Sequence, residues 1–219
     1  MTHDFWQSRW QQGEIGFHAA SVQPALIKHW PSLGVAQGAR VFVPLAGKSL
    51  DLHWLAERGY TIVGVELSPI AVADFFAEAK IDNVAITNDG PFSVHRAGPF
   101  EIWCGDYFAL DPKTVNVTAA YDRAALVAMT PDMQPAYADK LGQIMPAASK
   151  VLLIGLDYDQ SQMQGPPFSI PSARITELLA RNFTVDELGT HDGMAKSEHL
   201  RKRGLTRLEE TTYALTRRN

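Results

Sequence analysis

Four polar or aromatic side chains at predicted strand ends could bind and activate a small molecule. Glu66 closes an apolar run, where an acid can accept hydrogen bonds from both hydroxyls of a ribose. Asp106 and Tyr107 follow another apolar run, where an acid could bond an adenine amino group and a ring could stack on the base. Arg123 follows a third run, and its guanidinium could stabilise an anionic sulfur. These positions predict a site for an adenosine-containing cofactor beside a nucleophilic acceptor.

Each of these residues also has an ordinary structural interpretation. Glu66 could be a solvated carboxylate, and a ribose contact there would serve any adenosine-containing cofactor. The Asp106-Tyr107 pair could be a plain turn, and Asp122-Arg123 could be a local ion pair. The functional interpretation is favoured for Glu66 and Arg123, because ligands of open α/β sheets bind beyond the carboxyl ends of the central strands, while both interpretations of Asp106-Tyr107 stay open.

The loop from Leu45 to Ser49 separates a predicted strand from a predicted helix. Gly47 would let a ligand approach the backbone closely. The end of this loop imitates a phosphate-binding loop, but that motif needs a glycine where the chain has Phe42. The G-x-G-x-x-G fingerprint of dinucleotide-binding proteins is also absent after this strand. A nucleoside triphosphate site is therefore disfavoured, while a nicotinamide-dependent reductase stays open as an alternative.

Two apolar segments could wall a pocket. Trp10 and Phe17 lie in an aromatic stretch before the first strand, and a hydrophobic lid there would exclude water from a reaction. Pro166 and Pro167 form a second rigid apolar segment. We interpret His18 as structural. The basic cluster that ends at residue 203 is interpreted as a solvated loop.

The elements that must position these residues alternate between strand-length apolar runs and helix-length amphipathic stretches. This alternation predicts an α/β fold with a mainly parallel sheet and helices on both faces. The predicted strands are 40–44, 61–65, 93–97, 100–104, 119–122, 150–156, 183–189 and 206–216. The predicted helices are 49–58, 68–80, 130–143 and 172–181, and the second and third start with a hydroxyl cap followed by proline.

Length and composition fit one soluble domain. The chain has 219 residues, 46% of them hydrophobic, and a formal net charge of −4, which gives no general attraction to nucleic acid or membranes. One cysteine, Cys104, excludes an intrachain disulfide and suits a reducing compartment. Histidine and aspartate residues show no metal-ligand spacing. The start lacks a signal-peptide pattern, and no apolar run approaches the ~20 residues that span a bilayer. We expect a cytoplasmic monomer that acts on a small molecule.

Taken together, the segments of this chain resemble the thiopurine S-methyltransferase family, of bacterial type, over nearly the whole length. The resemblance rests on Trp6-x-x-x-Trp10-x-x-Gly13 with Phe17-His18, Val41-Phe42-Val43-Pro44-Leu45-Ala46-Gly47-Lys48, Arg58-Gly59-Tyr60, Val63-Gly64-Val65-Glu66, Asp122-Arg123-Ala124-Ala125-Leu126-Val127-Ala128 and Gly165-Pro166-Pro167-Phe168. Each segment is weak alone, but all of them in this order are a strong signal. The resemblance implies a Rossmann-like methyltransferase fold with a mostly parallel seven-stranded sheet and an antiparallel edge hairpin.

The resemblance also implies S-adenosylmethionine as the methyl donor and roles for single residues. The positions that match cofactor contacts are Trp10, Leu45, Gly47, Glu66, Asp106, Tyr107 and Arg123. The positions on the acceptor side are Phe17, Pro166, Pro167 and His199, the last standing where the family has an arginine. Arg123 is also similar to an arginine that holds or helps to deprotonate the acceptor, which makes it the catalytic candidate.

The implied acceptor is a small aromatic or heterocyclic thiol such as a thiopurine, with selenium and tellurium compounds, and hence tellurite resistance, as an extension. We expect a lid segment over residues 1–38 and a Rossmann-like core over residues 39–219 of a single domain. Two alternatives stay open: an NAD(P)-dependent reductase on the same fold, and a non-catalytic metalloid-binding resistance protein. The cofactor that raises the melting temperature would identify the reductase, and binding of tellurite or selenite without a methylated product would identify the metalloid-binding protein.

Overall fold

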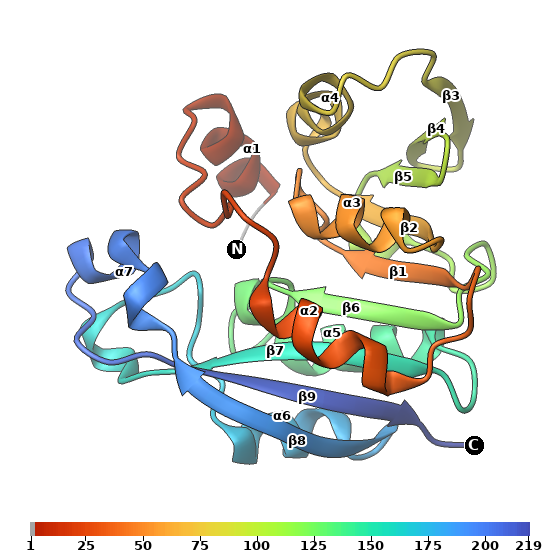
Figure 1. The fold of residues 1–219 in the computed structure, drawn as a ribbon. Coiled ribbons are helices and arrows are strands. Elements are labelled where there is room, and N and C mark those ends of the chain that lie inside the picture. Colours follow the sequence, from red (N-terminus) through yellow and green to blue (C-terminus); the bar gives the residue numbers. More distant parts are fainter. Residues whose placement is uncertain (1–2) are drawn as a thin grey trace.

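One nine-stranded sheet runs through the part of the chain that the computed structural model describes, which is residues 3–219 without the side chain of Lys196. Residues 1–2 of the expected lid segment lie outside it. The strand order is β3-β4-β5-β2-β1-β6-β7-β9-β8 (Figure 1). The strands are β1 (Arg40–Pro44), β2 (Thr61–Glu66), β3 (Ala85–Asp89), β4 (Phe92–Ala97), β5 (Phe100–Cys104), β6 (Ala119–Arg123), β7 (Lys150–Asp157), β8 (Phe183–Asp192) and β9 (Glu209–Arg217).

The centre of the sheet is parallel, as predicted. β1 pairs in parallel with β2 and β6, β2 with β5, and β6 with β7. Four of the five residues of β1 and five of the six of β2 are buried, because helices cover both faces. These strands therefore read as continuous apolar runs in the sequence.

The seven strands that the resemblance implied are too few, because the described sheet has nine, eight of which were predicted from apolar runs. β3 was missed because all of its residues are exposed, so no apolar run marks it. It pairs antiparallel with β4 and forms one edge. The predicted antiparallel pair at the other edge is confirmed as β8 and β9, although β9 begins at Glu209 and not at residue 206.

Of the two predicted capping signals, the one at Ser68 is confirmed and the one at Thr130 is wrong, while Ser49 also caps a helix. Ser49 and Ser68 cap α3 and α4, because their hydroxyls accept hydrogen bonds from backbone amides in the first turn at 3.2 and 3.3 Å. α5 begins at Gln134 and not at Pro131, since the residues between them form a turn. The α-helices are α1 (His3–Gln11), α2 (Pro24–His29), α3 (Leu50–Glu57), α4 (Pro69–Glu78), α5 (Gln134–Ile144), α6 (Ser172–Leu179) and α7 (Glu198–Lys202). The short 3-10 helices are η1 (Trp30–Leu33), η2 (Tyr107–Ala109), η3 (Leu126–Ala128), η4 (Gln160–Gln162) and η5 (Met194–Lys196).

Two main cores lie on opposite faces of the sheet, and β1 contributes to both. Val41 and Val43 belong to the core under α2, α3 and α4, whereas Phe42 belongs to the core under α5 and α6. This follows from the two-residue period of a strand. A third, smaller cluster, which includes Leu200, lies under α7.

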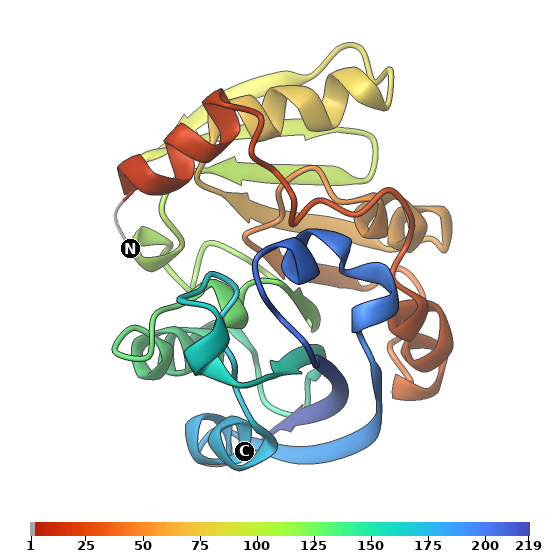
Figure 2. The ribbon, with the colours of Figure 1, turned by 90° about the vertical axis from the view of Figure 1, so that its left-hand side faces the viewer.

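The elements α1 and α7 lie beyond the carboxyl ends of the central strands (Figure 1). Viewed from that side, both segments stand in front of the sheet edge (Figure 2). The carboxyl ends of the central strands are therefore the part of the sheet that could hold a ligand under a cover.

Among residues 3–219, none of the helices is long and apolar enough to span a bilayer.

Candidate active site

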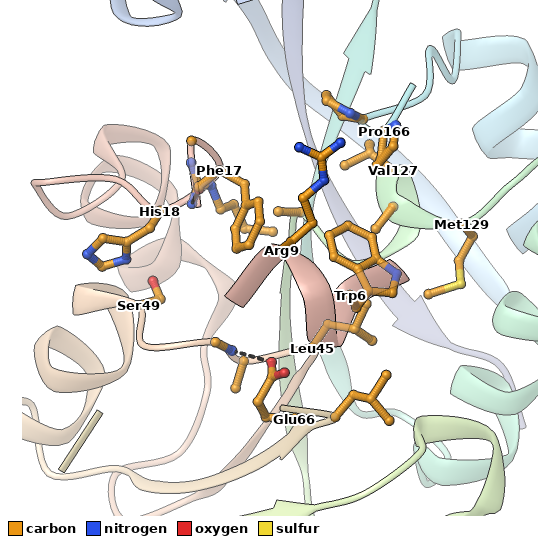
Figure 3. Close-up of a pocket in the computed structure, with 18 of the residues that line it drawn as sticks. Trp6, Arg9, Phe17, His18, Leu45, Ser49, Glu66, Val127, Met129 and Pro166 are labelled. Carbon is orange, nitrogen blue, oxygen red and sulfur yellow. Dashed lines mark hydrogen bonds between the residues drawn. The ribbon is translucent and has the colours of Figure 1, made fainter. Parts of the chain in front are cut away.

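A cavity of about 670 Å³ lies at the carboxyl ends of β1, β2, β6 and β7. This volume is in the range of about 300–1,000 Å³ that is usual for small-molecule sites. Its walls come from α1, the loops after the central strands, α7 and the loop that contains Pro166 and Pro167, called the proline loop here. In Figure 3, Glu66 lies at one end, and the rings of Phe17 and Trp6 point into the space between it and Pro166.

Glu66 ends β2, and its carboxylate joins the two loops at one end of the cavity. Oε2 accepts a hydrogen bond from the Gly47 amide at 2.8 Å (Figure 3), and Oε1 accepts one from the Ser68 amide at 2.7 Å. Burial raises the pKa of Glu66, while these amides act in the opposite direction. The amide of Leu67 also acts on this carboxylate. A carboxylate has about four acceptor positions, so at least one remains for a hydroxyl of a ligand.

The loop after β1 is strained and close to the aromatic segment. Leu45 has a φ of 48°, in the left-handed region that non-glycine residues avoid. Such strain gathers at functional sites. Gly47 follows with a φ of 53°, and a Cβ there would lie 3.5 Å from the ring of Trp10. Trp10 is only 7% exposed. The structure thus brings Trp10, Leu45, Gly47 and Glu66 together around one end of the cavity.

Asp106 and Tyr107 also line the cavity, but with different surroundings from those predicted. One oxygen of Asp106 caps η2, and the other lies 3.2 Å from Nε2 of His3. The ring of Tyr107 stacks on Phe42 and on Tyr137, with centroids 6.3 and 4.8 Å away. Its hydroxyl donates to the carbonyl of Tyr137 at 3.2 Å. Most of this ring is packed in the core at 3% exposure, and its stacking on a base stays a prediction.

Arg123 ends β6 and is half-buried at the cavity wall. Its Nη1 donates to the carbonyl of Phe17 at 3.3 Å. The local ion pair with Asp122 does not form, because Asp122 accepts a hydrogen bond from the Tyr137 hydroxyl at 2.7 Å and burial raises its pKa to about 6. No carboxylate within residues 3–219 forms a salt bridge with Arg123. Its positive charge is therefore available to a ligand.

The predicted acceptor-side residues Phe17, Pro166, Pro167 and His199 line the same cavity. The ring of Phe17 packs edge-to-face on Trp6 and Trp10, with centroids 5.8 and 5.6 Å away. His199 lies near the surface, and partial burial lowers its pKa, with further lowering from the charges of Arg203 and Arg123. This imidazole is therefore neutral at pH 7.

Two residues that the sequence analysis did not assign to the site, His18 and Arg203, line the cavity. His18 lines the cavity, and burial lowers its pKa, followed by the charge of Lys48. Arg203, assigned to a solvated loop, also lines the cavity and donates to backbone carbonyls of the proline loop. A basic cluster is usually solvated, and no local signal shows that one member reaches across to a distant loop. Within the described residues, no cluster of His, Cys, Asp and Glu could hold a metal ion.

Comparison with known proteins gives one family. Residues 1–218 match the family model described as Thiopurine S-methyltransferase. A protein of that name from Pseudomonas syringae pv. tomato is 46% identical over 219 residues, which are 100% of this chain and 99% of that protein. Another from Azotobacter vinelandii is 47% identical over 219 residues, which are 100% of this chain and 100% of that protein.

Solved structures share the fold at much lower identity. The Burkholderia thailandensis 1,6-didemethyltoxoflavin-N1-methyltransferase, solved with S-adenosylhomocysteine, has a TM-score of 0.66 and 16% identity, covering 99% of this chain and 87% of that one. A TehB-like SAM-dependent methyltransferase from Corynebacterium glutamicum has a TM-score of 0.55 and 9% identity, covering 96% of each chain. These likenesses confirm the predicted methyltransferase-type α/β fold.

Proposed function

Because the chain belongs to the thiopurine S-methyltransferase family, we propose that it methylates the sulfur of a small aromatic or heterocyclic thiol. As a member of that family it is an S-adenosylmethionine-dependent methyltransferase, which sets aside the nicotinamide-dependent reductase and the non-catalytic metalloid-binding protein. One observation carries the proposal for the site. The buried carboxylate of Glu66 is held by amides of the loops after β1 and β2 at the end of a covered cavity.

The residues around Glu66 fit a cofactor that contains a ribose. We assign the ribose hydroxyls to Glu66, because its carboxylate keeps at least one free acceptor position. Leu45 and Gly47 bring backbone close to the bound molecule, and Trp10 covers it from solvent. Asp106 is assigned to the adenine end, where Tyr107 supports the wall through its packing in the core. When bound, the cofactor supplies a methyl group on a positively charged sulfur.

The other half of the cavity suits a flat, apolar acceptor. Phe17, Pro166 and Pro167 give it apolar walls, which exclude water from the nucleophile. His199 lies at its mouth as a neutral imidazole. Holding two reactants in line can supply roughly 7–11 kcal/mol of a barrier. Positioning is therefore the main task of these side chains.

Arg123 is assigned the catalytic role of stabilising the acceptor as a thiolate. The support is its place on the cavity wall without a carboxylate partner among residues 3–219. We expect Arg123→Ala to lower kcat about a hundredfold, because it removes a preorganised charge. The Kd of S-adenosylhomocysteine should rise by less. Arg207→Ala, which removes an exposed arginine that pairs with Glu209, is the matched control. Equal losses in kcat and cofactor affinity would count against the catalytic role.

The acceptor is tested by transfer of a labelled methyl group to a panel of compounds. The panel holds a thiopurine, thiophenol, a selenol, selenite and tellurite. We expect label in the aromatic thiols, and the proposal extends to selenium and tellurium compounds because they are soft nucleophiles like thiols. Transfer to tellurium would also favour a role in tellurite resistance. Absence of label from every thiol would refute the proposed acceptor class.

We further propose that the chain is a cytoplasmic monomer that binds neither nucleic acid nor membranes. The support is its formal net charge of −4 and its single cysteine, Cys104, whose pKa is raised by burial. We also propose one domain in which residues 1–38 act as a lid on a core of residues 39–219. Light scattering that gives a mass near 24.2 kDa would support the monomer, and twice that mass would refute it.

A further inference from the structure

The segment Gly165-Pro166-Pro167, called the proline wall below, borders the acceptor half of the cavity, and two of its three residues cannot donate backbone hydrogen bonds. Pro166 and Pro167 have no backbone N–H, so they cannot donate hydrogen bonds to neighbouring strands or loops. Their carbonyl oxygens are the polar backbone groups that remain. The position of this wall therefore depends on donors from elsewhere in the chain.

Arg203, just after α7, and Tyr158, at the start of the same β7–α6 connection, supply these donors. Nη1 of Arg203 donates to the carbonyl of Pro166 at 2.7 Å, and Nη2 donates to that of Gly165 at 3.3 Å. The hydroxyl of Tyr158 donates to the carbonyl of Pro167 at 2.5 Å. Every carbonyl of the proline wall is thus held by a side chain. The planar guanidinium of Arg203 binds two of them at once.

Arg203 can act as a fixed clamp because its own segment is anchored. Leu200 and Leu205, on either side of it, are 3% and 2% exposed in the cluster under α7. Thr206 donates from its amide and its hydroxyl to Oε1 of Gln162 at 3.0 and 3.1 Å. The backbone at Arg203 is therefore tied to the core, although its side chain is exposed.

Arg203 pairs with no carboxylate in the part of the chain that the structure describes, so the carbonyls of the proline wall are its partners. It also lines the cavity itself. We propose that Arg203 is a positioning residue that sets the affinity for the acceptor by holding the proline wall. This inference rests on the proposed function for the identity of the bound molecule, but the clamp itself can be measured without it.

Arg203→Ala and Arg203→Lys test the clamp. Alanine removes both bonds, and lysine keeps the charge but loses the two-pronged geometry. Arg207→Ala is the control, since Arg207 is exposed nearby and pairs with Glu209. With thiophenol as acceptor, both Arg203 variants should raise KM about fivefold or more, as expected for lost charge-assisted bonds at an exposed site. Their kcat and their Kd for S-adenosylhomocysteine should stay at the wild-type values.

Hydrogen exchange gives a readout that needs no acceptor. The amide of Phe168, directly after the proline wall, donates to the carbonyl of Val127 at 2.6 Å. Its exchange should quicken about fivefold or more in Arg203→Ala and stay unchanged in Arg207→Ala. Wild-type KM in Arg203→Lys would overturn the clamp in favour of charge alone, and unchanged exchange at Phe168 would overturn it outright. If wild-type protein methylates no thiol, the proposed function fails and the exchange result alone decides the inference.

Discussion

Replacement of Glu66 by glutamine tests the residue on which the cofactor site depends. The change keeps the size of the side chain and removes its charge. In the structure both carboxylate oxygens already accept backbone amides, at 2.8 and 2.7 Å. A glutamine has one carbonyl oxygen, so its NH2 group must face either the Gly47 or the Ser68 amide, which is a donor as well. One loop contact and at least one ribose contact are therefore lost.

The size of the effect follows from the bonds removed. A hydrogen bond to a charged group contributes about 1.5–3 kcal/mol, and about 1.4 kcal/mol is a tenfold change in affinity. Loss of one ribose bond thus predicts a rise of about ten- to a hundredfold in the Kd of S-adenosylhomocysteine. Glu66→Asp keeps the charge but shortens the reach, and we expect a smaller rise.

Isothermal titration calorimetry with S-adenosylhomocysteine measures this Kd directly, without an acceptor. Thermal unfolding of each variant without ligand verifies that it folds. Glu57→Gln is a matched control, since Glu57 is an exposed carboxylate on α3 that does not line the cavity. A change of less than about threefold in a folded Glu66→Gln protein would refute the ribose contact.

Three further outcomes follow from buried groups. The folded carboxyl of Asp122 holds its proton more tightly than the unfolded one, since its pKa is raised from 3.8 to about 6. Its contribution to stability is therefore complete below pH 3.8 and declines by about 3 kcal/mol as pH rises through 6. The free energy of unfolding in urea should therefore depend less on pH in Asp122→Asn than in the wild-type protein. Identical pH profiles of the two proteins would contradict this. Gly64→Ala should lower the free energy of unfolding by about 1–3 kcal/mol, because the new Cβ would lie 2.7 Å from Cδ1 of Ile102 and 3.1 Å from Cβ of Ala46. An unchanged urea midpoint would count against this packing. Tyr121→Phe should lower the free energy of unfolding by about 1–3 kcal/mol in the same assay, because it removes the 2.9 Å hydrogen bond to the buried carboxylate of Asp51. A decrease below about 0.5 kcal/mol would mean that Asp51 finds another partner.

Local patterns predicted the elements that carry the cofactor half of the site. β1 and β2 are buried on both faces, so an apolar run marks each of them, and Glu66 stands out as the acid that ends the second. The caps at Ser49 and Ser68 are equally local, because a hydroxyl bonds an amide only a few residues away. β3 escaped prediction because pairing with β4, and not its own composition, makes it a strand.

The sequence by itself determined the fold class, the carboxyl ends of β1 and β2, and the family, since these depend on periodicity and ordered motifs along the chain. Only the tertiary structure decided where individual side chains point. The ring of Tyr107 packs in the core, and Arg203 donates to the proline wall. Asp122 accepts a hydrogen bond from Tyr137 and forms no ion pair with Arg123. Each of these outcomes joins elements far apart in the chain. Long-range packing and the need to pair buried polar groups select them, and no local pattern encodes that choice.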